Sequence, residues 1–132
     1  MQLRFLGKES AGGDSPTLYA SDRDTYVVQG WKVEDEAIVS GLDIPSDETC
    51  VEVPPRLLTY LGNDGVHGQV ASLSMPIVHV TAGGNYIIQG SRVHDGDALA
   101  QMRIPEYESC VEIPKLAIHA ILEDHNGGAD HK

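Results

Sequence analysis

Two stretches rich in β-branched and aromatic residues predict the main strands of the fold. TYVVQGWKV begins at Thr25, and NYIIQGSRV begins at Asn85. Such residues favour a pleated, half-buried surface. A short extended segment and a turn come before each strand, at residues 16–20 and 76–80. A glycine interrupts each strand, at Gly30 and Gly90, and indicates a bulge or a close backbone contact.

After each of these strands the hydrophobic spacing becomes helical. In VEDEAIVSGL, at 33–42, the apolar positions are spaced for a short helix, and the acidic residues crowd its first turn, where the helix dipole favours them. Residues 48–53 and 108–113 then predict strands. Helices are expected to begin at Pro54 and Pro114, because proline suits a first helical turn. In the first of them, Leu57, Leu58 and Leu61 form an apolar face.

The second half of the chain repeats the first at an offset of 60 residues. The identical pairs are Pro16/Pro76, Tyr26/Tyr86, Gln29/Gln89, Gly30/Gly90, Val33/Val93, Asp35/Asp95, Ile44/Ile104, Pro45/Pro105, Glu48/Glu108, Cys50/Cys110, Val51/Val111, Glu52/Glu112 and Pro54/Pro114. A unit this small is marginal alone. The sequence therefore predicts an α+β fold, in which two strand–strand–helix–strand–helix units pack with pseudo-two-fold symmetry into one compact domain.

The domain organisation follows from the repeat. Residues 1–61 form the first unit and residues 69–123 the second. The segment 62–68, GNDGVHG, is a polar, glycine-rich linker. Residues 124–132 are expected to be a flexible tail.

Charge narrows the classes of partner. The 132 residues carry a net charge of −11, which disfavours direct binding of nucleic acid or of anionic membranes. A basic protein or a cationic ligand is the partner that this charge would attract, although the charge also serves plain solubility. Because no apolar run reaches the ~18 residues of a membrane helix and the N-terminus has no secretory pattern, a cytoplasmic protein is expected.

Three residues are the candidates for binding a ligand or partner. Gln29 and Gln89 interrupt apolar strands at equivalent points, and a buried amide needs hydrogen-bond partners. Structural bonding within the sheet and contact with a ligand are both open for these amides. Trp31 is the single tryptophan, and Ser91 takes its place in the second copy. It is therefore either part of the core or an anchor for an interface or an asymmetric groove.

No catalytic, metal or cofactor site is predicted. Cys50 and Cys110 are expected to be small buried hydrophobic residues in strands. Glu52 and Glu112 alternate with apolar residues and are expected to face solvent, the alternative being a pair of carboxylates with raised pKa. The six histidines show no metal-binding spacing, and no phosphate loop, nucleophile elbow or dinucleotide motif occurs.

Part of the first half resembles a group of short, acidic, uncharacterised proteins of actinomycetes, often encoded beside helix-turn-helix regulators. The matching segments are FLGK at 5–8, SPTLYASDRDTYVVQGWKV at 15–33 and VEVPPRLLTYL at 51–61. The resemblance implies an accessory role, antitoxin-like, toward a DNA-binding regulator. A non-enzymatic protein-binding module is thus the main expectation. The alternatives are a small-molecule-binding domain with a groove between the repeats, and an enzyme without a recognisable motif.

Overall fold

The computed structural model describes residues 1–9 and 16–123, and the predicted tail 124–132 lies outside this part. The strands are β1 (Leu3–Lys8), β2 (Thr17–Ser21), β3 (Thr25–Lys32), β4 (Glu48–Val53), β5 (Ile77–Val80), β6 (Tyr86–Arg92) and β7 (Glu108–Pro114). The helices are α1 (Glu36–Val39), α2 (Gly96–Ala100), α3 (Lys115–His119) and the 3-10 helix η1 (Pro55–Asp64).

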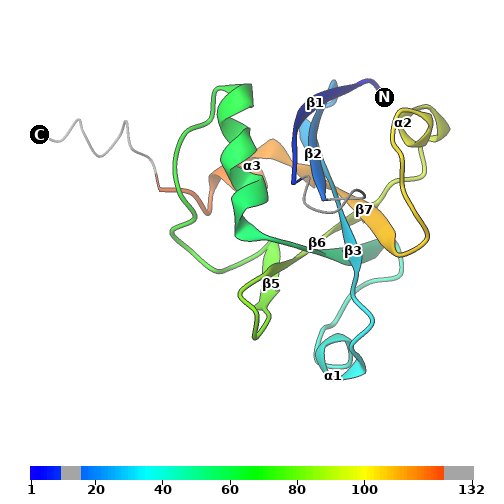
Figure 1. The fold of residues 1–132 in the computed structure, drawn as a ribbon, viewed down its shortest axis with the longest axis vertical. Coiled ribbons are helices and arrows are strands. Elements are labelled where there is room, and N and C mark those ends of the chain that lie inside the picture. The colour runs from blue at the N-terminus through cyan, green and yellow to red at the C-terminus, as the bar shows by residue number, and fades with distance from the viewer. Residues whose placement is uncertain (10–15, 124–132) are drawn as a thin grey trace, which may run out of the picture.

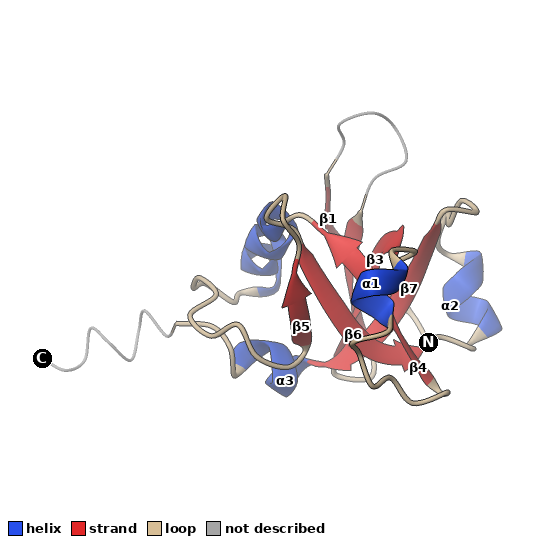
Figure 2. Cartoon of the chain, turned by 90° about the horizontal axis from the view of Figure 1, so that it is seen from below, coloured by secondary structure: helices blue, strands red, loops and turns tan. Residues whose placement is uncertain are grey.

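The predicted α+β fold class, with two helices in each unit, is wrong. The described part of the chain is mainly one antiparallel sheet of seven strands, with 38% of residues in strands and 21% in helices. The helical segments that the hydrophobic spacing predicted are too short to dominate, because α1 has four residues and α2 and α3 have five each. Helices of this length are not stable by themselves, and the seven-stranded sheet forms the centre of the fold (Figures 1 and 2).

The main strands pair across the two repeats. Tyr26 of β3 lies opposite Ile113 of β7, and Tyr86 of β6 lies opposite Val53 of β4, so the two registers match at the offset of 60. β3 also pairs with β4 at its end, and β6 with β7. These four strands therefore close into a ring of pairings. β2 and then β1 extend the sheet beyond β3, and β5 extends it beyond β6.

The strand glycines mark where the ring closes. A Cβ atom at Gly30 would lie 2.6 Å from the carbonyl oxygen of Glu52, and one at Gly90 would lie 2.8 Å from that of Glu112. Each glycine comes just before the residues at which its strand pairs with the second strand of its own repeat. The predicted close backbone contact is confirmed, and it allows the strands to cross.

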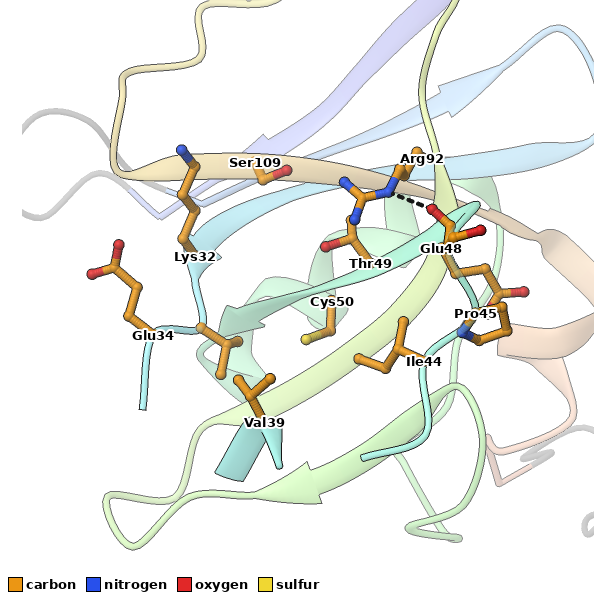
Figure 3. A pocket seen from close by; sticks show the side chains of 12 residues that line it. Lys32, Glu34, Val39, Ile44, Pro45, Glu48, Thr49, Cys50, Arg92 and Ser109 are labelled. Carbon is orange, nitrogen blue, oxygen red and sulfur yellow. Dashed lines mark hydrogen bonds between the residues drawn. The ribbon is translucent and has the colours of Figure 1, made fainter. Parts of the chain in front are cut away.

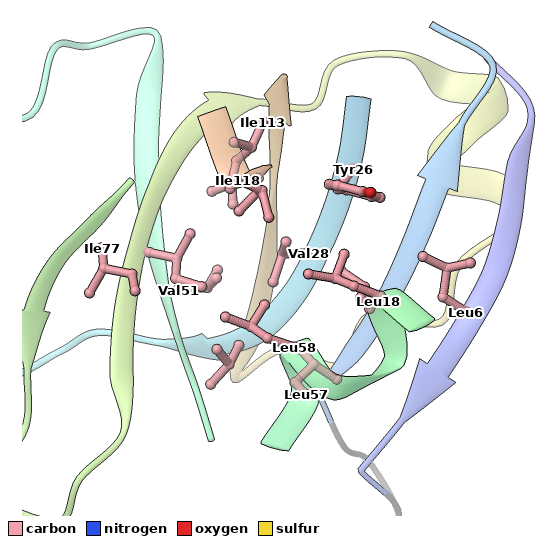
Figure 4. Packing of buried hydrophobic residues seen from close by; sticks show 14 of the residues in the cluster. Leu6, Leu18, Tyr26, Val28, Val51, Leu57, Leu58, Ile77, Ile113 and Ile118 are labelled. Atoms are coloured by element: carbon pink, nitrogen blue, oxygen red, sulfur yellow. The ribbon is translucent and has the colours of Figure 1, made fainter. Parts of the chain in front are cut away.

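The predicted apolar face of the first long helix is confirmed. Leu57, Leu58 and Leu61 of η1 are 0%, 6% and 1% exposed, and they pack with strand residues of both repeats in one cluster (Figure 4). Pro54 is extended and Pro55 opens the helix, where a missing N–H leaves no hydrogen bond unmade. The helix ends at Gly65, whose φ of 77° is in the left-handed region.

A polar cluster fixes the end of η1 to the sheet. The hydroxyl of Tyr26 donates to Oδ2 of Asp64 at 2.8 Å, and Nζ of Lys115 lies 3.0 Å from the same oxygen. Arg4 also pairs with Asp64. Burial opposes ionisation of Asp64, but the hydrogen bonds from Tyr26, Lys115 and Arg4 outweigh it and hold the pKa of Asp64 below its usual value.

The two repeats differ in how their short helices pack. Ala98 of α2 is fully buried, and the N-terminal amino group lies 3.1 Å from Asp95 at the start of this helix. The backbone N–H of Leu3 also donates to the side chain of Gln101, at 2.9 Å. By contrast, α1 has no buried residue and stands away from the sheet (Figure 1). The N-terminal segment thus fixes the helix of the second repeat, whereas α1 has no buried residue and is not packed on the sheet.

Candidate functional site

Gln29 and Gln89, the two glutamines predicted as candidate binding residues, each lie beside a glutamate of the other repeat. Nε2 of Gln29 donates to Oε1 of Glu108 at 2.7 Å and to the carbonyl oxygen of Arg103 at 2.7 Å. Nε2 of Gln89 donates to Oε1 of Glu48 at 2.5 Å. The two Gln–Glu pairs are equivalent at the offset of 60, so these amides link the repeats across the sheet.

The two Gln–Glu pairs differ in access. Gln29 and Glu108 are 3% and 2% exposed, and neither Oε1 of Gln29 nor Oε2 of Glu108 has a hydrogen-bond partner in the described part of the chain. Gln89 is 9% exposed, and Glu48 is half-buried. Glu48 lines two pockets and Gln89 lines one of them, whereas Gln29 and Glu108 line neither of these two.

Trp31 is half-buried at the end of β3, opposite Glu108 of β7 and Glu52 of β4. It lines neither pocket that contains Glu48. The structure therefore brings Gln89 to a pocket with Glu48, but does not bring Trp31 to that pocket.

A pocket with several reactive and charged side chains is lined by residues of both repeats, and its volume is about 390 Å³. We call it the inter-repeat pocket, and Figure 3 shows it. It is lined by Lys32, Val33, Glu34, Val39, Ile44, Pro45, Ser46, Glu48, Thr49, Cys50, Arg92 and Ser109. The open position of α1 leaves Val39 and the segment 44–46 as one wall.

Four polar residues of this pocket form two repeat-related pairs. Lys32 is equivalent to Arg92, and Thr49 is equivalent to Ser109, at the offset of 60. Figure 3 shows the four side chains on the same side of the pocket. Arg92 donates from Nε to the carbonyl oxygen of Ser46 at 3.0 Å. Neither Lys32 nor Arg92 forms an ion pair with another described residue, so both charges are available to a ligand.

The opposite side of the inter-repeat pocket is apolar. Val39, Ile44 and Cys50 lie there in Figure 3. Burial raises the pKa of the Cys50 thiol, and burial raises that of Cys110 to about 11. Both cysteines are buried, at 7% and 6% exposure, which confirms that they serve as small hydrophobic residues. A protonated thiol is a poor nucleophile, so this wall offers contact area for an apolar group.

The polar residues of this pocket, Lys32 and Arg92 among them, were not among the candidates that the sequence suggested. Lys32 and Arg92 are two of nine basic residues in a chain with 20 acidic ones, and they occupy equivalent positions of the repeat. That coincidence was visible in the sequence. Its meaning was not, because the pairing of β3 with β4 and of β6 with β7 is needed to bring both ends to one place.

Glu52 and Glu112 are half-buried and accept hydrogen bonds from other side chains. The expectation that they face solvent is therefore only partly correct. Nδ2 of Asn85 donates to Glu52 at 2.9 Å. The hydroxyl of Thr25 donates to Glu112 at 2.7 Å. Positions 25 and 85 are repeat-related, and these bonds hold equivalent carboxylates beside equivalent strand starts.

The described residues also bear on a metal site and on a membrane-spanning helix. No group of three or more His, Cys, Asp or Glu side chains is arranged there to hold a metal ion. Within residues 1–9 and 16–123, each helix is too short or too polar to cross a membrane.

No protein-family model, curated protein or solved structure matches the chain. The resemblance to acidic actinomycete proteins therefore stays a prediction.

Proposed function

We propose that this protein is a small-molecule-binding domain, and that its inter-repeat pocket takes a small organic carboxylate with an apolar portion. The observation that carries the proposal is the convergence of Lys32, Arg92, Thr49 and Ser109 on one pocket of about 390 Å³. This volume is in the range of small-ligand sites, about 300–1,000 Å³. Two cations and two hydroxyl groups are the donors that a carboxylate needs.

The charge balance of the pocket disfavours a ligand with more than one negative charge. Glu34 and Glu48 also line the pocket, and Glu48 already accepts a hydrogen bond from Gln89. Two cations beside two carboxylates disfavour a polyanion such as a phosphate ester. The wall of Val39 and Ile44 would cover the apolar portion of the ligand.

The test is a titration with hexanoate, and with the neutral hexanamide as the comparison ligand, by calorimetry and ligand-observed NMR. The wild-type protein is expected to bind hexanoate and not hexanamide. Charged hydrogen bonds contribute about 1.5–3 kcal/mol each, so Lys32→Gln or Arg92→Gln should weaken hexanoate binding by on the order of 10–100-fold. Lys8→Gln removes the same charge from an exposed position on β1 and should leave the affinity unchanged. Equal binding of acid and amide, or equal affinities in all variants, would refute the proposal.

Protein binding is the second candidate function, and the open position of α1 favours it. Glu34, Asp35 and Glu36 are exposed on this segment, and the net charge of −11 attracts a basic partner, such as a helix-turn-helix regulator. A decalysine peptide serves as the probe. Glu34→Gln with Glu36→Gln should weaken its salt-sensitive binding more than the same charge change at Glu106 and Glu123, which are exposed elsewhere. Equal weakening in both double variants would refute a binding surface on α1.

A further inference from the structure

A second pocket lies on the β6 side of the ring, and its volume is about 290 Å³. We call it the Ser91 pocket. The residues of it that matter here are Glu48, Met75, Gln89, Ser91 and Ala117. We propose that the Ser91 pocket binds a small arylalkylamine, whose ring fills the apolar part and whose ammonium group donates to Glu48. Glu48 lines both pockets, but this inference does not depend on the function proposed for the inter-repeat pocket.

The internal repeat explains why the pocket exists. Sixty residues earlier, Trp31 stands in place of Ser91 and Leu57 in place of Ala117. The registers show that positions 31 and 91 are equivalent, because Trp31 lies opposite Glu108 and Glu52, and Ser91 lies opposite Glu48 and Glu112. The first repeat therefore places an indole and a leucine where the second has a hydroxymethyl and a methyl group. Leu57 is fully buried, and the second repeat leaves the corresponding volume open.

The size and shape of the missing groups indicate the ligand. An indole ring is the group that the fold itself places at the equivalent position of the first repeat. A pocket of about 290 Å³ is just below the range for small-ligand sites, about 300–1,000 Å³. It suits one planar ring system better than a longer molecule. Met75 is 59% exposed beside it, and a flexible thioether makes favourable contacts with aromatic rings.

The polar end of the Ser91 pocket can accept a hydrogen bond from a ligand. In the first repeat, Nε2 of Gln29 bonds both to Glu108 and to the carbonyl oxygen of Arg103. In the second repeat, Gln89 bonds to Glu48, and no bond to the equivalent residue, Asp43, joins it within the described part of the chain. Glu48 is half-buried and lines the pocket. Its carboxylate can accept hydrogen bonds and no other described residue pairs its charge, so a protonated amine is the matching group.

The test uses tryptamine as the probe and tryptophol, which carries an alcohol in place of the amine, as the comparison. Binding is measured by calorimetry and saturation-transfer NMR. Wild-type protein is expected to bind tryptamine at least 10-fold more tightly than tryptophol. Ser91→Trp copies the first repeat and should reduce tryptamine binding at least 10-fold. Ser40→Trp adds the same side chain at an exposed position on the end of α1 and should leave it unchanged.

A second variant guards against misfolding of Ser91→Trp. Ala117→Leu copies Leu57 and fills the pocket from α3, so it should also reduce tryptamine binding, and each variant is used only at a urea midpoint close to that of wild type. Glu48→Gln should remove the preference for the amine over the alcohol. Unchanged tryptamine affinity in folded Ser91→Trp and Ala117→Leu, or no tryptamine binding by wild type at millimolar concentration, overturns the inference. Hexanoate binding through Lys32 and Arg92 is measured in parallel, so failure of one site is distinguished from failure of the other.

Discussion

The crossing of strands at Gly30 gives the sharpest test of the closed ring. In the variant Gly30→Ala, the new Cβ atom would lie 2.6 Å from the carbonyl oxygen of Glu52 and 2.6 Å from Cγ1 of Val53. Both distances are shorter than a normal contact, and one neighbour is backbone that belongs to the paired strand. The methyl group therefore forces the strands apart where β3 changes from one partner to the other.

The size of the effect follows from two opposing terms. Overpacking of a core by one methyl group costs about 1–3 kcal/mol, and the contact with backbone puts this site toward the upper end. The substitution also reduces the freedom of the unfolded chain, which stabilises the folded state by about 0.4–1 kcal/mol. We expect a net loss of about 2 kcal/mol. For a domain of this size the melting temperature should fall by about 8 °C.

The assay is urea unfolding, followed by the fluorescence of Trp31 and by far-ultraviolet circular dichroism. Gly96→Ala is the matched control, because nothing lies within 4 Å of a Cβ atom there. Gly96 begins α2, so alanine should leave stability unchanged or raise it by up to about 1 kcal/mol. A Gly30→Ala variant as stable as wild type, to within about 0.5 kcal/mol, would refute the close crossing of β3 and β4.

Two further predictions concern buried groups. Because hydrogen bonds lower the pKa of Asp64 in the folded state, its stabilising effect is present above the usual value of 3.8 and is lost as pH falls through the folded pKa. The free energy of unfolding of Asp64→Asn should therefore be lower than that of wild type by about 1.5–3 kcal/mol at pH 7. In urea titrations this difference should shrink below pH 3.8. A constant difference from pH 7 to pH 2 would contradict this assignment. Cys110 should react with a thiol reagent at pH 8 only as fast as the protein opens, because it is buried and burial raises its pKa to about 11. Rapid labelling of Cys110 in native protein would show that the strands around it are not closed.

The sequence predicted local features of the fold better than its class. The strands at 48–53 and 108–113 and the starts of helices after Pro54 and Pro114 follow from β-branched residues and from proline, whose effects are local. The helix predicted in the segment 33–42 is shorter in the structure, because its spacing is helical but α1 has no buried residue that packs on a core. The pairing of β3 with β7 depends on distant residues, and no local pattern contains that register.

The candidate sites were predictable only in part. Gln29, Gln89 and Trp31 drew attention because each breaks the pattern of its own strand, and Gln89 does border a pocket. Lys32 and Arg92 end their strands as ordinary exposed cations. The role proposed for them rests on the pocket that both residues line, and that pocket is a property of the assembled sheet.

The exchange of strand partners between the repeats has a consequence for synthesis on the ribosome. β3 leaves the exit tunnel long before β7 has been translated, so its hydrogen-bonding groups on that side wait for most of the second repeat. An unpaired apolar strand can associate with neighbouring nascent chains. Slow translation of the second repeat, or early termination before it, should therefore make this polypeptide a client of nascent-chain chaperones.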